Sequence, residues 1–152
     1  MDSKLSGLPS SLSEHAAVGC SFGILQIVTA SLASENRALV HPASADNIPT
    51  AGNQEDHVSM GSIAARKARD IARNLEQVLA IELLCAAQGL DFVGPEKSGR
   101  GVRRAHEILR GRVPFLKEDR SRIFHDDIAA VAALLHDGQL LAGVEQAVGR
   151  MG

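Results

Sequence analysis

The strongest constraint on the fold is a long stretch without proline, from about Asp56 to Leu90. Its apolar residues recur at intervals of three and four, the spacing of one face of an α-helix. At a rise of about 1.5 Å per residue, such a helix is on the order of 50 Å long. Because the mean globular helix has only about 11–12 residues, we predict a member of a large helical bundle, of a kind often shared between subunits.

The side chains available for packing favour the same fold class. Aromatic residues make up 3% of the chain, with no Trp and no Tyr. Ala, Leu, Ile and Val must therefore form the core, and small side chains favour close helix–helix contacts over a sheet built on bulky cross-strand pairs. We predict an all-α protein, and the 152 residues have the usual size of a single domain.

Capping and breaking residues predict where the helices begin and end. Ser11 and Glu14 form a capping box, which starts a helix near Leu12. Proline and glycine residues separate this helix from the long one and from the shorter helices that follow. The helices are predicted over residues 12–36, 56–90, 102–111, 126–137 and 139–148.

Charge and hydropathy argue against several classes of protein. The net charge of −2 indicates neither a nucleic-acid partner nor a membrane surface. The uncharged run Ala16–Ala33 approaches the length of a membrane span, but it contains polar residues and lacks flanking aromatic or basic anchors. A helix buried within a bundle is the better interpretation. Because the N-terminus lacks a signal-peptide layout, we predict a cytoplasmic protein.

A long irregular connection, residues 37–54, precedes the long helix. Pro42 and Pro49 remove backbone donors and exclude a helix there. Connections of this length in compact domains are usually functional or disordered. Its apolar residues and low charge favour an ordered, functional loop.

Four consecutive polar residues, Gln54, Glu55, Asp56 and His57, stand where the loop meets the long helix. A helix start needs one capping side chain, which Asp56 or Ser59 can provide, and the helix dipole favours an acidic residue nearby. Conspicuous polar groups on a held loop often carry function. From the residues alone, a functional site and a simple helix cap remain open alternatives.

The sequence does not favour a metal site or a nucleophile. Zinc ligands on a helix need a spacing such as i, i+4, and the chain has no H-x-x-x-H pair, so we predict no metal. Ser59 lacks a G-x-S-x-G elbow. Cys20 and Cys85 lie in apolar helical runs, where burial makes a thiol unreactive. Glu82, in the same run as Cys85, is expected to be a hydrogen-bonded core carboxylate.

The stretch between Ala33 and Phe92 closely resembles histidine ammonia-lyases, of the aromatic amino acid lyase family. The motif NQEDHVSMG within it is specific, and the likeness extends to GLPSSL, RVPFLKEDR and DDIAAVAALLHDG. It covers nearly the whole chain. Full family members are several times longer, so the chain is similar to their C-terminal portion only.

This resemblance implies a fold and a reaction. The fold is the fumarase-like helical fold, in a homotetramer whose active sites are built from several chains. The reaction is the non-oxidative loss of ammonia from L-histidine to give trans-urocanate, a step of histidine catabolism. The resemblance places Glu55 at the substrate, where it handles a proton or binds the imidazole, and Gln54 in the same pocket. Phenylalanine-directed relatives carry an N-Q-D type stretch here, which favours histidine as the substrate.

The chain also departs from the family pattern. The family's electrophile, methylidene-imidazolone (MIO), forms from Ala-Ser-Gly, a tripeptide that does not occur in this chain. The tyrosines that the family uses are absent, and Gly19 and Gly23 stand where Asn and Met are expected. We therefore expect a chain that is inactive alone and contributes Glu55 and Gln54 to a composite site, as a homo-oligomer or with a partner lyase fragment. The alternatives are a non-catalytic oligomerisation or regulatory module and a truncated remnant of the lyase.

Overall fold

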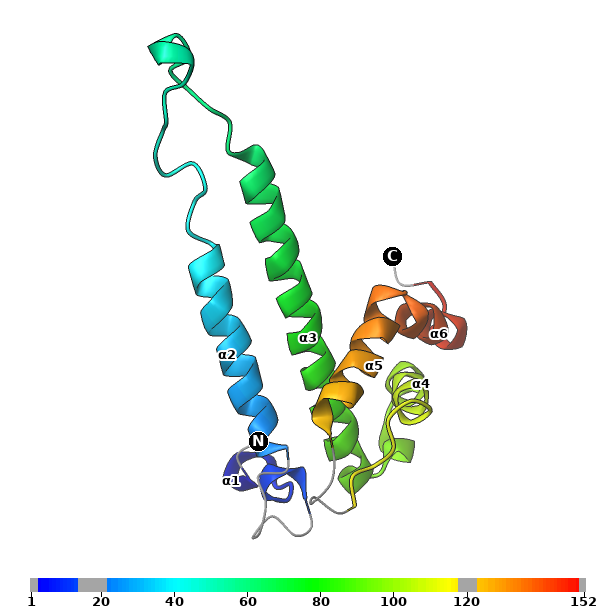
Figure 1. Ribbon diagram of the computed structural model, residues 1–152. Coiled ribbons are helices and arrows are strands. Elements are labelled where there is room, and N and C mark those ends of the chain that lie inside the picture. Colours follow the sequence, from blue (N-terminus) through cyan, green and yellow to red (C-terminus); the bar gives the residue numbers. More distant parts are fainter. Residues whose placement is uncertain (1–2, 14–21, 118–122, 151–152) are drawn as a thin grey trace. The chain divides into compact units, whose positions relative to one another are not determined.

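The computed structural model describes residues 3–13, 22–117 and 123–150 (Figure 1). Throughout these ranges the regular structure is helical, apart from one isolated β-bridge between Thr50 and Glu55. The all-α prediction is confirmed. The helices are α1 (Ser3–Ser6), α2 (Gly23–Leu39), α3 (Gly61–Val93), α4 (Arg100–Arg110), α5 (Phe124–His136) and α6 (Gln139–Val148), with 3-10 turns η1 (Ser10–Leu12), η2 (Ala51–Asn53) and η3 (Pro95–Lys97).

The long helix α3 has 33 residues, from Gly61 to Val93. The prediction of residues 56–90 placed its start five residues too early, because the backbone of Asp56 and Val58 is hydrogen-bonded to the Asn47 side chain instead. The helix ends where the sequence changes character. Gly94 follows it with a left-handed φ of 98°, and its N–H donates to the Leu90 carbonyl at 2.9 Å. Pro95 comes next and cannot continue the helix, so this is a glycine-terminated C-terminus. The buried residues of α3 all lie between Ala80 and Gly89. The second half is not buried on all sides, however, because Glu82 is exposed rather than a core carboxylate.

Helix α2 begins later than the predicted helix 12–36 to which it corresponds. A helix from Leu12 is excluded, because Ser11 and Leu12 have left-handed φ angles of 53° and 54° and Ser13 is extended. The Leu12 side chain is buried and its carbonyl accepts a hydrogen bond from the Gln88 side chain at 3.2 Å. Tertiary contacts thus override the local capping signal. Glu14 and Cys20 lie outside the described residues.

The three remaining predicted helices are present as α4, α5 and α6. Two have ends shifted by one or two residues, which is the usual uncertainty of such boundaries, and the last, 139–148, has the predicted ends.

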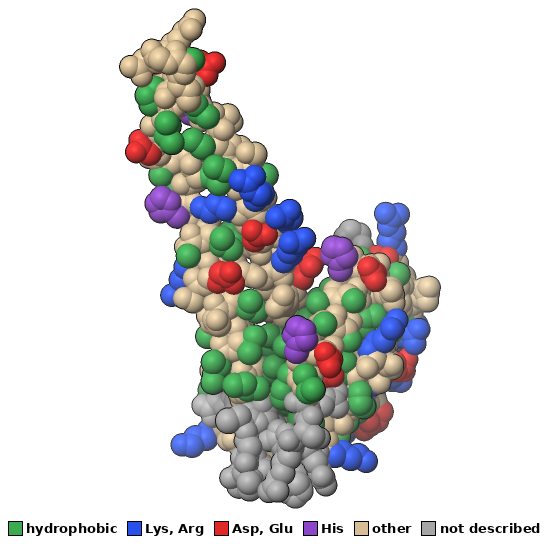
Figure 2. Space-filling model, viewed as in Figure 1, with side chains coloured by type: hydrophobic (Ala, Val, Ile, Leu, Met, Phe, Trp, Pro, Cys, Tyr) green, Lys and Arg blue, Asp and Glu red, His purple; other side chains and the backbone are tan. Residues whose placement is uncertain are grey.

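Among the described residues, no single helix is long and apolar enough to cross a membrane, although α5 and α6, bent by 61°, pass that test as a pair on length and composition alone. In Figure 2 basic and acidic side chains are interspersed over the visible face rather than gathered into one large patch.

The sequence predicts one domain over residues 1–152, whereas the chain divides into two compact units. One unit comprises Met1–Thr29 and Glu76–Gly152, and the other is Ala30–Leu75. The second unit holds the end of α2, the long connection and the start of α3, all close in sequence. It therefore consists largely of local structure, and it contains the predicted site.

The first unit has the apolar core, with Leu25, Leu84, Leu109, Val131 and Leu134 among its buried side chains. Helices α4 and α6 pack closely against each other. A glycine on α6, Gly143, lies at this contact and leaves room for a side chain of α4, because a Cβ atom there would lie 2.4 Å from Ile108 Cδ1.

Candidate functional site

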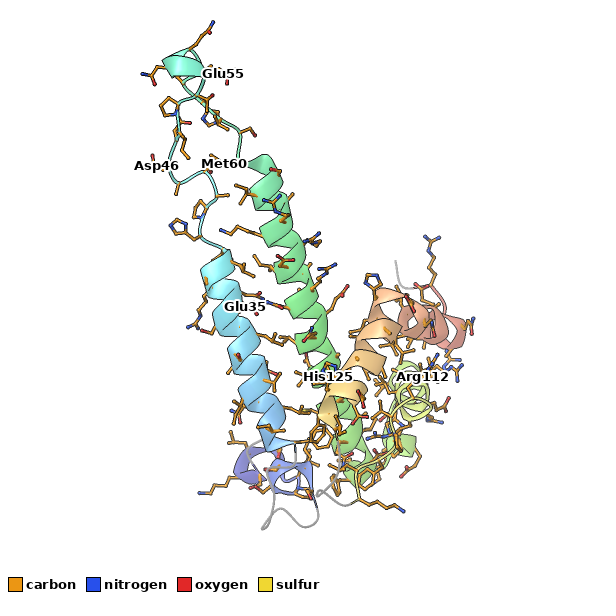
Figure 3. All side chains as sticks on the ribbon, in the orientation of Figure 1. Glu35, Asp46, Glu55, Met60, Arg112 and His125 are labelled. Carbon is orange, nitrogen blue, oxygen red and sulfur yellow. The ribbon has the colours of Figure 1, made fainter. Side chains whose placement is uncertain are left out.

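The predicted site residues lie in the connection between α2 and α3. Figure 3 shows Glu55 at the far end of this connection, with Asp46 and Met60 on the two arms that lead to it. The four polar residues from Gln54 to His57 are all exposed. The connection reverses direction at residues 50–55, so that its arms run back toward the helices it joins.

A tight turn presents Glu55. Thr50 and Glu55 form an antiparallel bridge, in which the Thr50 N–H donates to the Glu55 carbonyl at 3.0 Å and the Glu55 N–H donates to the Thr50 carbonyl at 3.3 Å. Between them Ala51, Gly52 and Asn53 have φ angles of 51°, 64° and 66°. The left-handed conformation at Ala51 costs roughly 1–2 kcal/mol, which the bridge has to offset.

The turn also fixes the side chain of Glu55. The Thr50 hydroxyl donates a hydrogen bond to Glu55 Oε2 at 2.7 Å, the normal length for an O–H···O bond. The other oxygen, Oε1, has no partner among the described residues. The carboxylate is therefore held on one side and open on the other.

A third residue, Asn47, ties the two arms of the connection together. Its Nδ2 donates to the Asp56 carbonyl, and its Oδ1 accepts from the Val58 N–H at 3.3 Å. Its own N–H donates to the Asp46 carboxylate at 2.7 Å. The chain is thus held just after Glu55 as well as before it.

The base of the connection is braced in two places within the same unit. The Lys67 ammonium of α3 donates to the His41 carbonyl. Further along, Asn74 Nδ2 donates to Glu35 Oε2 at 3.2 Å and to Asn36 Oδ1 at 3.0 Å. The first contact ties the first arm to α3, and the second ties α3 to the last turns of α2, from which that arm leaves. The connection is therefore held at its base rather than free.

The simple helix-cap interpretation does not account for the polar cluster. Helix α3 begins at Gly61, too far along the chain for Asp56 to cap it. The Ser59 hydroxyl accepts from the Gly61 N–H, but at 3.4 Å this is a weak contact. Gln54 and His57 make no side-chain contact that would explain them structurally in the described part of the chain.

Other chemistry is poorly supported in the described ranges. They hold no group of three His, Cys, Asp or Glu side chains arranged to bind a metal ion. Burial raises the pKa of the Cys85 thiol to about 11, and the neighbouring Glu82 carboxylate adds to the rise. A thiol with this pKa is almost entirely protonated at neutral pH and is a poor nucleophile.

A buried polar cluster in the first unit was not predicted, because no sequence motif marks it. Gln88 is 0% exposed and contacts four groups: its Nε2 donates to the Leu12 and Leu116 carbonyls at 3.2 and 3.1 Å, and its Oε1 accepts from the Leu116 N–H and from Arg110 Nη2, both at 3.2 Å. Asp91 accepts from Arg110 Nε at 2.8 Å and lies 2.7 Å from His106 Nε2. These bonds join η1, α3, α4 and the segment after α4, so the cluster is a structural support.

Comparison with known proteins agrees with the resemblance seen in the sequence. A family model described as aromatic amino acid lyase matches residues 1–111. The chain belongs to the aromatic amino acid lyase family. Histidine ammonia-lyase from Symbiobacterium thermophilum is 52% identical over 146 residues, which are 96% of this chain and 28% of that protein.

Solved structures of a histidine ammonia-lyase and a tyrosine aminomutase share the fold. Histidine ammonia-lyase from Trypanosoma cruzi matches with a TM-score of 0.89 and 39% identity, over 95% of this chain and 28% of that one. Tyrosine aminomutase from Streptomyces globisporus matches with the same TM-score and 35% identity, over 96% and 28%. The chain therefore has the helical lyase fold and spans about 28% of the length of these relatives, in their C-terminal portion.

Proposed function

We propose that the chain contributes Glu55 and Gln54 to a composite active site of a histidine ammonia-lyase, which converts L-histidine into trans-urocanate and ammonia. The observation that carries the proposal is the Glu55 carboxylate, which is fixed through Oε2 by Thr50 and open at Oε1. The sequence similarity to histidine ammonia-lyases over nearly the whole chain supports the choice of reaction.

The geometry suits either role that the resemblance implies for Glu55. An oriented, open carboxylate oxygen can accept a charge-assisted hydrogen bond from an imidazole, which would select histidine over an apolar side chain. It can also exchange a proton with the reacting substrate. Gln54 precedes it on the same exposed turn, where its amide can donate to or accept from the same ligand.

The electrophile must come from elsewhere. The chain contains no Ala-Ser-Gly sequence, so its own residues do not fit the MIO group, which activates the amine for departure when it is present. In the proposed site that group belongs to a lyase segment outside these 152 residues. The role of this chain is to place Glu55 and Gln54 against the substrate.

Complementation tests the proposal. The 152-residue chain alone is expected to give no urocanate, whose near-ultraviolet absorbance makes the assay direct. Mixed with a lyase fragment that carries the Ala-Ser-Gly loop, it is expected to give activity that Glu55→Gln abolishes. Glu96→Gln is the matched control, because it makes the same change at an exposed carboxylate of the other unit.

Each result has a definite meaning. Activity of the chain alone would contradict the missing electrophile. Activity of the mixture that survives Glu55→Gln would refute the assigned site. Association without activity would favour a non-catalytic oligomerisation module, and no association together with molten behaviour would favour a truncated remnant.

The exposed apolar residues of α3 support an oligomeric partner. Ile63, Leu75 and Leu79 on this single helix are 39%, 51% and 40% exposed. Covering such residues is favourable by roughly 25 cal/mol per Å² of apolar surface. We propose that α3 packs against further copies of the chain in the homotetramer that the resemblance implies. The same resemblance leads us to propose that the protein acts in histidine catabolism in the cytoplasm. Sedimentation equilibrium of the chain tests the assembly, and a monomer at micromolar concentration would contradict it.

A further inference from the structure

We propose that Thr50 is a positioning residue for this site: its hydroxyl orients the Glu55 carboxylate through Oε2, so that Oε1 faces the substrate. The inference rests on the proposed function, because it assigns a partner to the carboxylate that this function uses. It adds Thr50 to Glu55 and Gln54 as a determinant of activity, and no motif in the sequence marks it.

The backbone brings the two side chains together. Thr50 and Glu55 are the two members of the antiparallel bridge, and side chains of a directly opposed pair project from the same face. The hydroxyl and carboxylate therefore meet because of the turn geometry, at 2.7 Å. The turn is specific, since three consecutive residues adopt left-handed φ angles between the bridged pair.

Threonine is well suited to this task. Its β-branched side chain has a restricted χ1 angle, so the direction of the hydroxyl follows from the backbone. An exposed glutamate without such a partner populates several rotamers, and substrate binding would have to order it. A hydrogen bond formed in advance reduces that ordering requirement.

Asn47 keeps this arrangement in place from the other side. Its amide contacts the backbone of Asp56 and Val58 immediately after Glu55. The backbone at Glu55 is thus held independently of the Thr50 hydroxyl, by the bridge before it and by Asn47 after it. Removing the hydroxyl alone is therefore expected to release the carboxylate and leave the turn intact.

This separation allows a direct test by nuclear magnetic resonance on the full 152-residue chain. Thr50→Val removes the hydroxyl at nearly constant shape, and Thr50→Ser retains it. Thr29→Val is the matched control, because the Thr29 hydroxyl bonds to the Leu25 carbonyl of its own helix, α2, at 2.9 Å, away from the connection. Side-chain scalar couplings report the rotamers of Glu55, and amide hydrogen exchange reports the bridge.

We expect one dominant Glu55 rotamer in the wild-type, Thr50→Ser and Thr29→Val chains, and averaged couplings in Thr50→Val. Amide exchange at residues 50 and 55 is expected to change less than about threefold in Thr50→Val, a small effect on local opening. Averaged Glu55 couplings in the wild-type chain, or an unchanged single rotamer in Thr50→Val, would overturn the inference. Exchange accelerated more than about tenfold would also overturn it, because Thr50 would then merely stabilise the turn.

Kinetic measurements on the complemented lyase test the effect of Thr50 on activity. Thr50→Val is expected to lower kcat/KM about tenfold, at the weak end of hydrogen bonds to charged groups. The loss is expected in kcat if Glu55 exchanges a proton with the substrate, and in KM if Glu55 binds the imidazole. Thr50→Ser is expected to restore most of the activity, and Thr29→Val to leave it unchanged.

The two hypotheses fail in different ways. If Glu55→Gln abolishes activity while Thr50→Val leaves kcat and KM unchanged, the positioning role is wrong and the proposed function survives. If Glu55→Gln leaves activity intact, the proposed function is wrong and the functional part of this inference falls with it. The resonance measurement still decides whether the hydroxyl orients the carboxylate.

Discussion

Replacing Gln88 by leucine is expected to destabilise the first unit by about 1–4.5 kcal/mol. The side chain is 0% exposed and takes part in four hydrogen bonds, to two carbonyls, one backbone N–H and the Arg110 guanidinium. Leucine has a similar size but satisfies none of them. Because Arg110 keeps its bonds to Asp91 and to the Val113 carbonyl, the main cost is the three buried backbone groups that lose a partner.

The magnitude follows from those backbone groups. Leaving a buried donor or acceptor without a partner costs about 1–3 kcal/mol, so the unpaired Leu116 N–H and the two carbonyls together cost about 4–6 kcal/mol after partial relaxation. Burial of the leucine side chain returns about 1.5–3 kcal/mol. The difference is a large fraction of the 5–15 kcal/mol that stabilises a typical domain.

Urea unfolding monitored by circular dichroism measures this difference through the transition midpoint. Gln77→Leu is the matched control, because it makes the same change at an exposed position of the same helix and is expected to stay within about 0.5 kcal/mol of the wild type. A loss below about 1 kcal/mol for Gln88→Leu would refute the reasoning, since it would mean that the backbone groups find other partners.

Three further predictions follow from packing and charge. Asp91→Asn is expected to cost about 2 kcal/mol in thermal unfolding, since it leaves two partly buried basic side chains of α4 without their carboxylate; an unchanged melting temperature would contradict this. Gly143→Ala is expected to change the stability by less than about 1 kcal/mol, because the atom that its Cβ would meet at 2.4 Å, Ile108 Cδ1, is the end of a flexible side chain and alanine is the better helix former; a loss above about 2 kcal/mol in the same melt would contradict this. In a Cys20→Ser background, Cys85 should react with a disulfide reagent at a rate that rises about tenfold per pH unit from pH 8 until its pKa of about 11. A plateau near pH 9 would show that the thiol is not desolvated.

The long helix was predictable because its signals are local. An uninterrupted helical period predicts the body of α3, and Gly94 followed by Pro95 marks its end. The start near Leu12 was wrong for the opposite reason. The capping box there is a local signal, but burial of the Leu12 side chain and the bond to its carbonyl from Gln88 impose left-handed and extended backbone instead.

The site was only partly predictable. Glu55 and Gln54 stand out as polar residues in a specific motif. Thr50 and Asn47 do not, because their roles depend on a turn that brings residues five and nine positions apart into contact. Ala51 adopts a positive φ in this turn, and an alanine in the sequence does not predict a conformation that is uncommon for residues other than glycine.

The sequence by itself determined the helical class, the long continuous helix and the residues that link this chain to the aromatic amino acid lyases. These features depend on hydrophobic periodicity, on the positions of glycine and proline, and on motif identity. All three are properties of residues that are close together in the sequence. Only the tertiary structure decided that Gln88 is a buried polar support, that Glu82 is exposed and that Thr50 holds one oxygen of Glu55. The physical reason is that a hydrogen bond is satisfied by whichever group the fold brings within reach, and for these residues that group lies across a turn or on another element.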